Sequence, residues 1–224
     1  MSGRLIPLAL VRNPRARRYV LRLQPDGAAR VTIPRGGSAA EAKRFAERNT
    51  AWLERQFQRL AMHSSRPKEW LIGTQILFRG VPVSIKAGRN GERGFIQLGG
   101  EIVRVSDAEA DLRPAIERHL WRVAATELPP RVLHYAALHQ LSVRRITVRN
   151  QKSRWGSCSR RGTISLNWRL IQTPSQVQDY IVLHELCHLR EMNHSVRFWR
   201  EVERVCPDFQ AAEHWLKQHS QLLR

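Results

Sequence analysis

The sequence predicts an α+β protein: a β-rich N-terminal region with one long helix, residues 1–105, followed by a compact domain with several helices, residues 106–224. Short alternating apolar runs separated by Gly and Pro turns fill much of the first region, and apolar residues at helical spacing are frequent in the second. Hydrophobic residues make up 42% of the chain, and seven Trp and six Phe supply large side chains for a core. This composition argues against intrinsic disorder.

The chain is strongly basic, with 38 Lys and Arg against 19 Asp and Glu and a formal net charge of +19. One interpretation is a solvated, Arg-rich surface. The other is an electrostatic surface for nucleic acid, where Lys and Arg release the counterions of phosphates. Neither a zinc finger nor a helix-turn-helix signature nor an aromatic RNA-reading motif accompanies the charge, so a nucleic-acid partner stays an open possibility.

Targeting signals are absent from the sequence. No window approaches the roughly 18 apolar residues of a membrane helix, and the apolar part of the N-terminus is too short for a secretory signal. The three cysteines, Cys158, Cys187 and Cys206, show no disulfide framework. We therefore expect a cytoplasmic protein with free thiols and no membrane partner.

The first elements are a hairpin and a helix. Residues 17–34 alternate apolar and polar positions on both sides of Pro25-Asp26-Gly27, which indicates a strand, a turn and a second strand. Ser38 followed by Glu41 is a capping-box signature, and apolar residues recur at helical spacing after it. The pattern predicts one helix over about 38–62.

Two further hairpins are expected in residues 70–105, where short alternating runs are punctuated by glycines. A second capping box, Ser106 with Glu109, then begins a stretch of apolar residues at helical spacing. Pro129-Pro130 inside this stretch predicts a kink or a break. The change of pattern predicts a domain boundary near residue 105.

The second half is predicted to contain a strand (145–149), a loop (150–162), a half-buried strand (163–170) and then three helices. The first of these three helices has a clear start. Thr173 is the expected N-cap, and Pro174 occupies the first helical position.

A metal-site motif lies on this helix. His184 and His188 are four residues apart, so their imidazoles lie on one helical face and can bind one ion. Glu185 follows the first histidine, completing the H-E-x-x-H pattern in which glutamate is the general base on water at the open metal position. The flanking residues are apolar nearly all round, as in a buried helix. The alternative, two core histidines and a surface glutamate, would bury polar groups at a cost of several kcal/mol unless they found partners.

A catalytic zinc needs a third protein ligand, and His194 is the candidate. A continuous helix would carry His194 to the wrong face, so the helix must stop first, and Met192-Asn193 is a plausible place because Asn tolerates the left-handed conformation. The sequence leaves three alternatives open: His214, Glu201 and Glu203. We expect one Zn²⁺ per chain.

The residues around this motif resemble the YgjP-like metallopeptidases, which are related to the SprT-like zinc proteases. The matching segments are Arg154-Trp155-Gly156-Ser157-Cys158, Ile164-Ser165-Leu166-Asn167, residues 180–189, Asn193-His194-Ser195, Phe198-Trp199 and Pro207-Asp208. The resemblance implies that residues 106–224 form a compact zincin-type metallopeptidase domain, with zinc on His184, His188 and His194 and a peptide or protein as substrate. Glu191 stands where the metzincin pattern has Gly, which excludes that assignment.

Other residues keep two interpretations. Arg154 and Trp155 either line a substrate cleft, as the resemblance suggests, or hold the loop and plug the core. Cys158 and Cys187 are interpreted as packing residues rather than ligands. A second donor for the transition-state oxyanion could be Tyr180, His214 or Arg154.

The rival function is a basic nucleic-acid-binding protein with a structural or inactive metal site, or a protease that acts on DNA-bound proteins. The oligomeric state is unknown from the sequence.

Overall fold

A computed structural model describes residues 6–24, 26–64, 69–88, 94–220, 222 and 223. The chain forms two compact units, Met1–Lys68 and Glu69–Arg224. In the part of the chain that the structure describes, no helix is long and apolar enough to cross a membrane.

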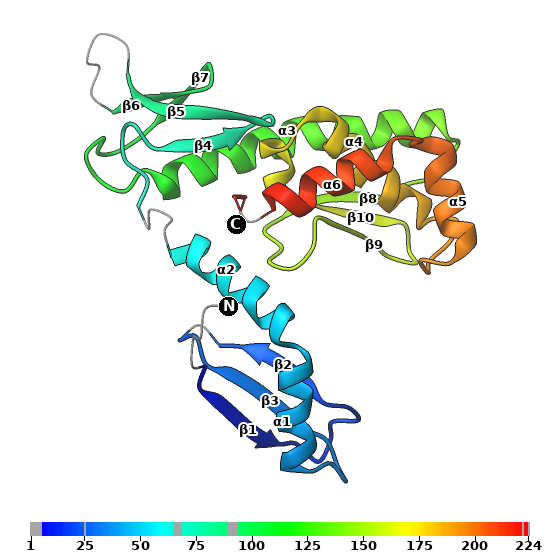
Figure 1. Ribbon diagram of the computed structural model, residues 1–224. Helices are drawn as coiled ribbons and strands as arrows, with labels where there is room; N and C mark the ends of the chain where they lie inside the picture. Colours follow the sequence, from blue (N-terminus) through cyan, green and yellow to red (C-terminus); the bar gives the residue numbers. More distant parts are fainter. Residues whose placement is uncertain (1–5, 25, 65–68, 89–93, 221, 224) are drawn as a thin grey trace. The chain divides into compact units, whose positions relative to one another are not determined.

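The first unit is a three-stranded sheet covered by helices (Figure 1). Its elements are β1 (Leu8–Arg12), β2 (Val20–Leu23), β3 (Ala29–Ile33), α1 (Ala39–Arg48) and α2 (Thr50–Ser64). The hairpin of β2 and β3 agrees with the sequence prediction, and β1, which was not predicted, pairs in parallel with β3. Val31 and Ile33 pack against Ala42 and Ala46 to form a small core.

The predicted helix over 38–62 is two helices that meet at Asn49. Its start is as expected, since the Ser38 side chain accepts from the backbone of Glu41 and the Glu41 carboxylate accepts from the backbone of Ser38. Asn49 then ends α1, and its side-chain amide donates to the carbonyl of Phe45 at 2.7 Å. This local hydrogen bond competes with the helical pattern and accounts for the break.

The second unit begins with a four-stranded antiparallel sheet in the order β4-β5-β6-β7. Its strands are β4 (Gln75–Phe78), β5 (Val81–Ala87), β6 (Phe95–Leu98) and β7 (Glu101–Arg104). Both predicted hairpins are present, and pairing of β5 with β6 joins them. Ile85, Ile96 and Val103 belong to the same core as the helix that follows. The compact unit therefore starts at residue 69, whereas the change of pattern in the sequence predicts a boundary near residue 105.

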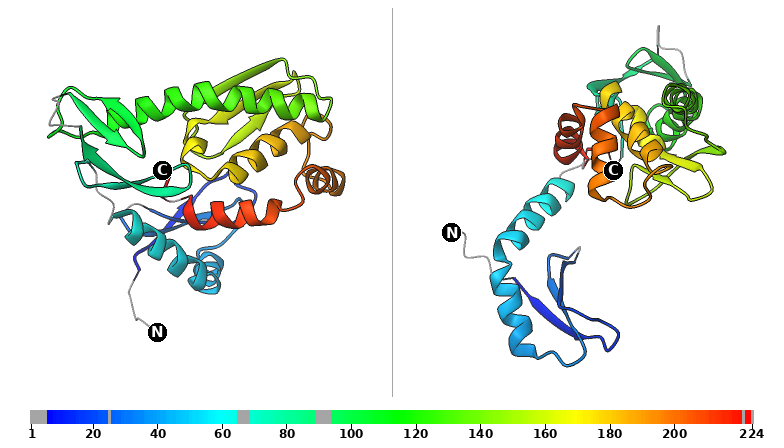
Figure 2. Two further views of the ribbon diagram at one scale, coloured as in Figure 1. Left: turned by 90° about the horizontal axis from the view of Figure 1, so that it is seen from above. Right: turned by 90° about the vertical axis from the view of Figure 1, so that its right-hand side faces the viewer.

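The central helix α3 (Arg113–Leu138) spans this unit, with the β4–β7 sheet beside its first half and the remaining elements beside its second (Figures 1 and 2). It begins later than the predicted capping box at Ser106 and Glu109, since its N-cap is Leu112. Asp111 accepts from the backbone N–H of Arg113 and of Trp70. The helix continues through Pro129-Pro130, so the expected break does not occur.

The remaining elements surround α4. They are β8 (Arg145–Arg149), β9 (Gly156–Cys158), β10 (Thr163–Asn167), the 3-10 helix η2 (Trp168–Gln172), α4 (Ser175–Cys187), α5 (Val196–Val205) and α6 (Phe209–His219). The sheet order is β8-β10-β9, with β8 parallel and β9 antiparallel to β10. The strand predicted over 163–170 ends at Asn167, because the Asn167 side chain caps η2 by accepting from Arg169 N–H.

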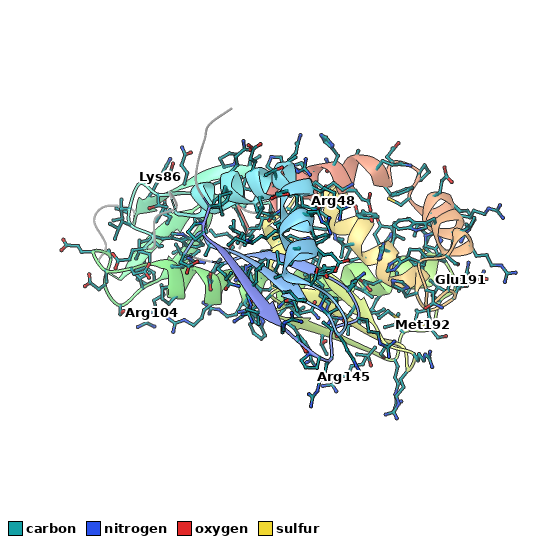
Figure 3. The ribbon with its side chains drawn as sticks, turned by 60° about the horizontal axis from the view of Figure 1, so that its bottom comes forward. Arg48, Lys86, Arg104, Arg145, Glu191 and Met192 are labelled. Carbon is teal, nitrogen blue, oxygen red and sulfur yellow. The ribbon has the colours of Figure 1, made fainter. Side chains whose placement is uncertain are left out.

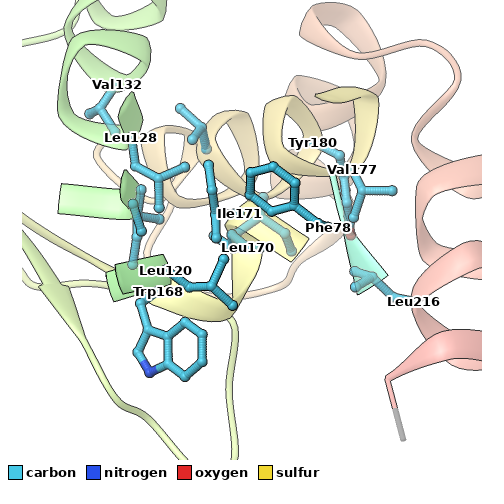
Figure 4. Close-up of a cluster of buried hydrophobic side chains, with 14 of the residues drawn as sticks. Phe78, Leu120, Leu128, Val132, Trp168, Leu170, Ile171, Val177, Tyr180 and Leu216 are labelled. Carbon is cyan, nitrogen blue, oxygen red and sulfur yellow. The ribbon is translucent and has the colours of Figure 1, made fainter. Parts of the chain in front are cut away.

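The large core lies between α3, η2 and α4. Figure 4 shows Leu128, Leu170 and Ile171 gathered between these helices, with Phe78 from β4 inserted among them. All four are at most 2% exposed. This packing fixes α4, the helix that carries the metal-site motif.

Candidate metal centre

The buried helix α4 places His184 and Glu185 on its last turn and a half. The predicted N-cap is wrong, because Pro174 is the cap residue and the Thr173 hydroxyl donates instead to the carbonyl of Leu170 at 2.7 Å. The helix ends at Cys187, with His188 as its C-cap. Glu185 is 6% exposed and His188 is 9% exposed, so the motif lies largely below the protein surface.

His194 reaches the other two histidines because the chain turns after α4. Glu191 and Met192 lie on this turn (Figure 3). The helix therefore stops before the expected point, and Asn193 is not among the described residues with left-handed backbone. One ring nitrogen from each histidine lies within 4.8 Å of the others, and Nε2 of His184 is 3.1 Å from Nε2 of His194.

This geometry fits a metal ion. Two nitrogens that each lie about 2.05 Å from a tetrahedral zinc would be roughly 3.3 Å apart, close to the observed separation. Burial and the neighbouring imidazoles His188 and His194 lower the pKa of His184 to about 4, which keeps its ring in the neutral form that a metal requires. Burial also lowers the pKa of His188.

Hydrogen bonds orient two of the rings. His188 Nδ1 lies 3.0 Å from the carbonyl of Glu191, which can only accept, so Nδ1 carries the proton and Nε2 is free for a ligand bond. His184 Nδ1 lies 3.5 Å from the Tyr180 hydroxyl, and that hydroxyl donates to Glu213 Oε1 at 3.0 Å. Tyr180 therefore accepts from His184. Sequence reasoning did not identify Glu213, which comes from α6.

Two aromatic residues of α5 support the histidine rings. Phe198, fully buried, stacks on His188 with ring centroids 4.4 Å apart. Trp199 stacks on His194 with centroids 5.8 Å apart. In the sequence, Phe198-Trp199 is one of the segments that carry the resemblance, and the structure adds a contact with the candidate ligands.

Glu185 lies against the edge strand β9. A Cβ on Gly156 would lie 2.5 Å from Glu185 Oε1, so only glycine leaves room for the carboxylate. Burial raises the pKa of Glu185 to about 8, and the positive charge of Arg154 opposes part of this shift. A buried carboxylate of raised pKa beside metal ligands is suited to proton transfer.

A cavity of about 440 Å³ opens onto the histidines and Glu185. Arg154 and Trp155, the predicted substrate residues, line it together with Tyr180 and Met192. Asn167 fixes the loop by donating to the carbonyl of Arg154 at 3.0 Å. Because β9 is an edge strand of its sheet, an extended peptide has backbone groups to pair with beside the site.

The alternative ligands lie elsewhere. Glu201 pairs with Arg190 and Arg204, and His214 contacts Gln218 at 2.8 Å. Among the described residues, the histidine triad is the one group of three whose ligand atoms converge.

The two thiols near the site fit a packing role. Burial raises the pKa of Cys158 to about 11 and that of Cys187 to about 12, so both stay protonated.

Of the three candidate oxyanion donors, Arg154 and Tyr180 line the cavity. The Tyr180 hydroxyl already donates to Glu213, which leaves Arg154 as the better placed donor.

A comparison with protein families indicates a metallopeptidase. A family model described as YgjP-like, metallopeptidase domain, matches residues 17–219. Two similar solved structures are metallopeptidase zymogens. Abylysin of Pyrococcus abyssi is 27% identical with a TM-score of 0.37, over 43% of this chain and 96% of its own. Jannalysin of Methanocaldococcus jannaschii is 23% identical with a TM-score of 0.37, over 43% and 98%. No curated protein matches the chain significantly.

Proposed function

The chain belongs to the YgjP-like metallopeptidase family, and from that premise we propose that it hydrolyses peptide bonds with one zinc ion on His184, His188 and His194. As a member of this family it is a metal-dependent peptidase whose substrates are peptides or proteins. This proposal about the metal ligands and the base rests on the convergence of three histidine imidazoles beside a buried glutamate.

When bound, the metal would supply Lewis acidity that lowers the pKa of water and polarises the substrate carbonyl. The residues of the chain supply the rest. Glu185 takes a proton from the attacking water and passes it to the departing amine, so the carboxylate is regenerated. The edge strand β9 and the side chains of Arg154 and Trp155 would hold the extended substrate.

The substitution Glu185→Gln tests this proposal. The amide is nearly isosteric but cannot accept the proton, so cleavage of an unfolded protein such as casein should fall by about 10²–10⁴-fold. The metal content should stay at the wild-type level. Glu203→Gln is the matched control, since this glutamate is exposed on α5. Equal cleavage rates for wild type and Glu185→Gln would refute the role of the base.

The alternative, a nucleic-acid-binding protein with a structural or inactive metal site, is less well supported. A purely structural metal site does not require the carboxylate of Glu185, which is buried and forms no salt bridge among the described residues. A protease acting on DNA-bound proteins stays compatible with the basic charge.

We also propose a cytoplasmic location, which the three free cysteines support.

A further inference from the structure

A second cavity, of about 1240 Å³, lies in the unit Glu69–Arg224, between the strands β6 and β7 and the outer face of α3. It shares no lining residue with the cavity at the histidines. The peptidase chemistry therefore leaves this groove without a role.

The groove is positively charged. Arg104, Arg118 and Arg122 line it, are exposed, and form no ion pair with any residue that the structure describes. Figure 3 shows Arg104 extending outward near the end of β7. The one acidic lining residue, Glu117, is neutralised by Arg113 at 3.0 Å and Arg169 at 3.8 Å. Three guanidinium groups thus remain free for an anionic ligand.

The groove also exposes aromatic rings. Trp121 is 44% exposed and Phe95 is 36% exposed, although both are large hydrophobic residues. Trp121 lies on the same face of α3 as Arg118 and Arg122, while Leu120 on the other face is fully buried. An indole between two arginines gives a stacking surface beside positive charge.

We propose that this groove binds single-stranded nucleic acid, with bases stacked on Trp121 and Phe95 and phosphates held by Arg104, Arg118 and Arg122. Cationic grooves with interleaved aromatic residues bind single strands, since every base has a face that can stack. In a duplex those faces are already covered by base stacking, so a duplex could bind the groove only through its phosphates. The net charge of +19 favours a polyanion over a neutral partner.

Binding of a fluorescent 20-nucleotide oligo(dT) to the full chain tests the phosphate contacts. We expect Arg118→Gln/Arg122→Gln to weaken binding about tenfold or more and to reduce the slope of log K against log salt by about 1.4, roughly 0.7 for each lost contact. The control Arg197→Gln/Arg200→Gln removes the same charge from exposed positions on α5. Equal losses in both double variants, or no binding of oligo(dT) at low salt, would overturn the proposal.

Variants of Trp121 test the stacking. Trp121→Ala should weaken binding several-fold or more without changing the salt slope, and Trp121→Phe should restore most of the affinity. An unchanged affinity in Trp121→Ala would contradict the proposal. The proposal would also be contradicted if poly-glutamate displaced the labelled oligo(dT) as effectively as unlabelled oligo(dT) does. That result would indicate an acidic protein partner. Peptidase activity is not part of either readout, so this inference can fail independently of the proposed function.

Discussion

Gly156 of β9 packs directly on Glu185 of α4, with no space for a side chain between the strand and the carboxylate. A Cβ on Gly156 would lie 2.5 Å from Oε1 and 2.6 Å from Cγ of Glu185. The edge strand that flanks the cavity therefore also sets the position of the proposed base.

This contact predicts the effect of Gly156→Ala. The methyl group would displace the Glu185 carboxylate, and a base that is misplaced by about 1 Å can cost roughly 10²-fold in rate. We expect a large loss of peptide hydrolysis with little loss of bound metal, because the three atoms nearest to the added methyl group all belong to Glu185 and none to a histidine. Metal analysis and a cleavage assay on the same preparation separate the two effects. Wild-type activity in this variant would show that Glu185 tolerates displacement.

The metal content of the histidine variants provides a second prediction. We expect close to one zinc per purified chain, lost in His184→Ala and His188→Ala and weakened in His194→Ala. His214→Ala is the control, since His214 is exposed and contacts Gln218. Elemental mass spectrometry gives the stoichiometry. Full occupancy in the first two variants, or loss in the control, would contradict the proposed ligands.

The contacts of Tyr180 predict an effect on metal affinity from outside the ligand set. Tyr180→Phe removes the oxygen that faces His184 Nδ1, and Glu213→Gln weakens the partner that orients this hydroxyl. Losses of about 10–100-fold in metal affinity are typical for such partners. Glu213 also pairs with the exposed Lys217 at 3.7 Å, so Lys217→Gln is the control. A competition assay with a zinc chelator measures the metal affinity of each variant. If Tyr180→Phe bound zinc as tightly as wild type, the Tyr180 hydroxyl would have no role in orienting His184.

Local patterns predicted the elements whose signals are contained in a short stretch of sequence. The hairpin around Gly27 has its turn and both strands within one segment, and the structure confirms it. The strand Leu8–Arg12 was missed because it pairs in parallel with a remote strand and no turn marks the connection. The boundary near 105 followed a change of local pattern. The compact unit depends instead on long-range packing of residues such as Ile96 against α3.

The candidate site divides in the same way. His184 and His188 are visible in the sequence because helical spacing alone brings them to one face, and Glu185 is visible because it completes the H-E-x-x-H pattern. Gly156 and Glu213 are not visible, since their contacts depend on how β9 and α6 pack against α4. A glycine in a short strand beside a metal motif is the one signal that could have suggested the close approach.

The last prediction concerns the turn that carries His194. Arg190 on this turn donates to Glu201 of α5 and, at 3.0 Å, to the carbonyl of His139 at the end of α3. Glu201 also accepts from Arg204, and hydrogen bonds from Arg204 and the charge of Arg190 lower the pKa of Glu201. The ionised carboxylate is therefore the form that stabilises the folded chain.

Glu201→Gln should lower the melting temperature of the metal-free protein at neutral pH by a few degrees, since partly exposed ion pairs contribute up to about 1 kcal/mol. Because the folded pKa lies below the ordinary glutamate pKa of 4.5, the stabilisation is complete above that pH and is lost as the pH falls through the folded value. The difference between wild type and variant should thus stay constant at higher pH and shrink toward zero in acid. Melting curves of both proteins across this range measure it directly. A difference that grew as the pH fell would mean that the Glu201 carboxylate does not anchor the turn.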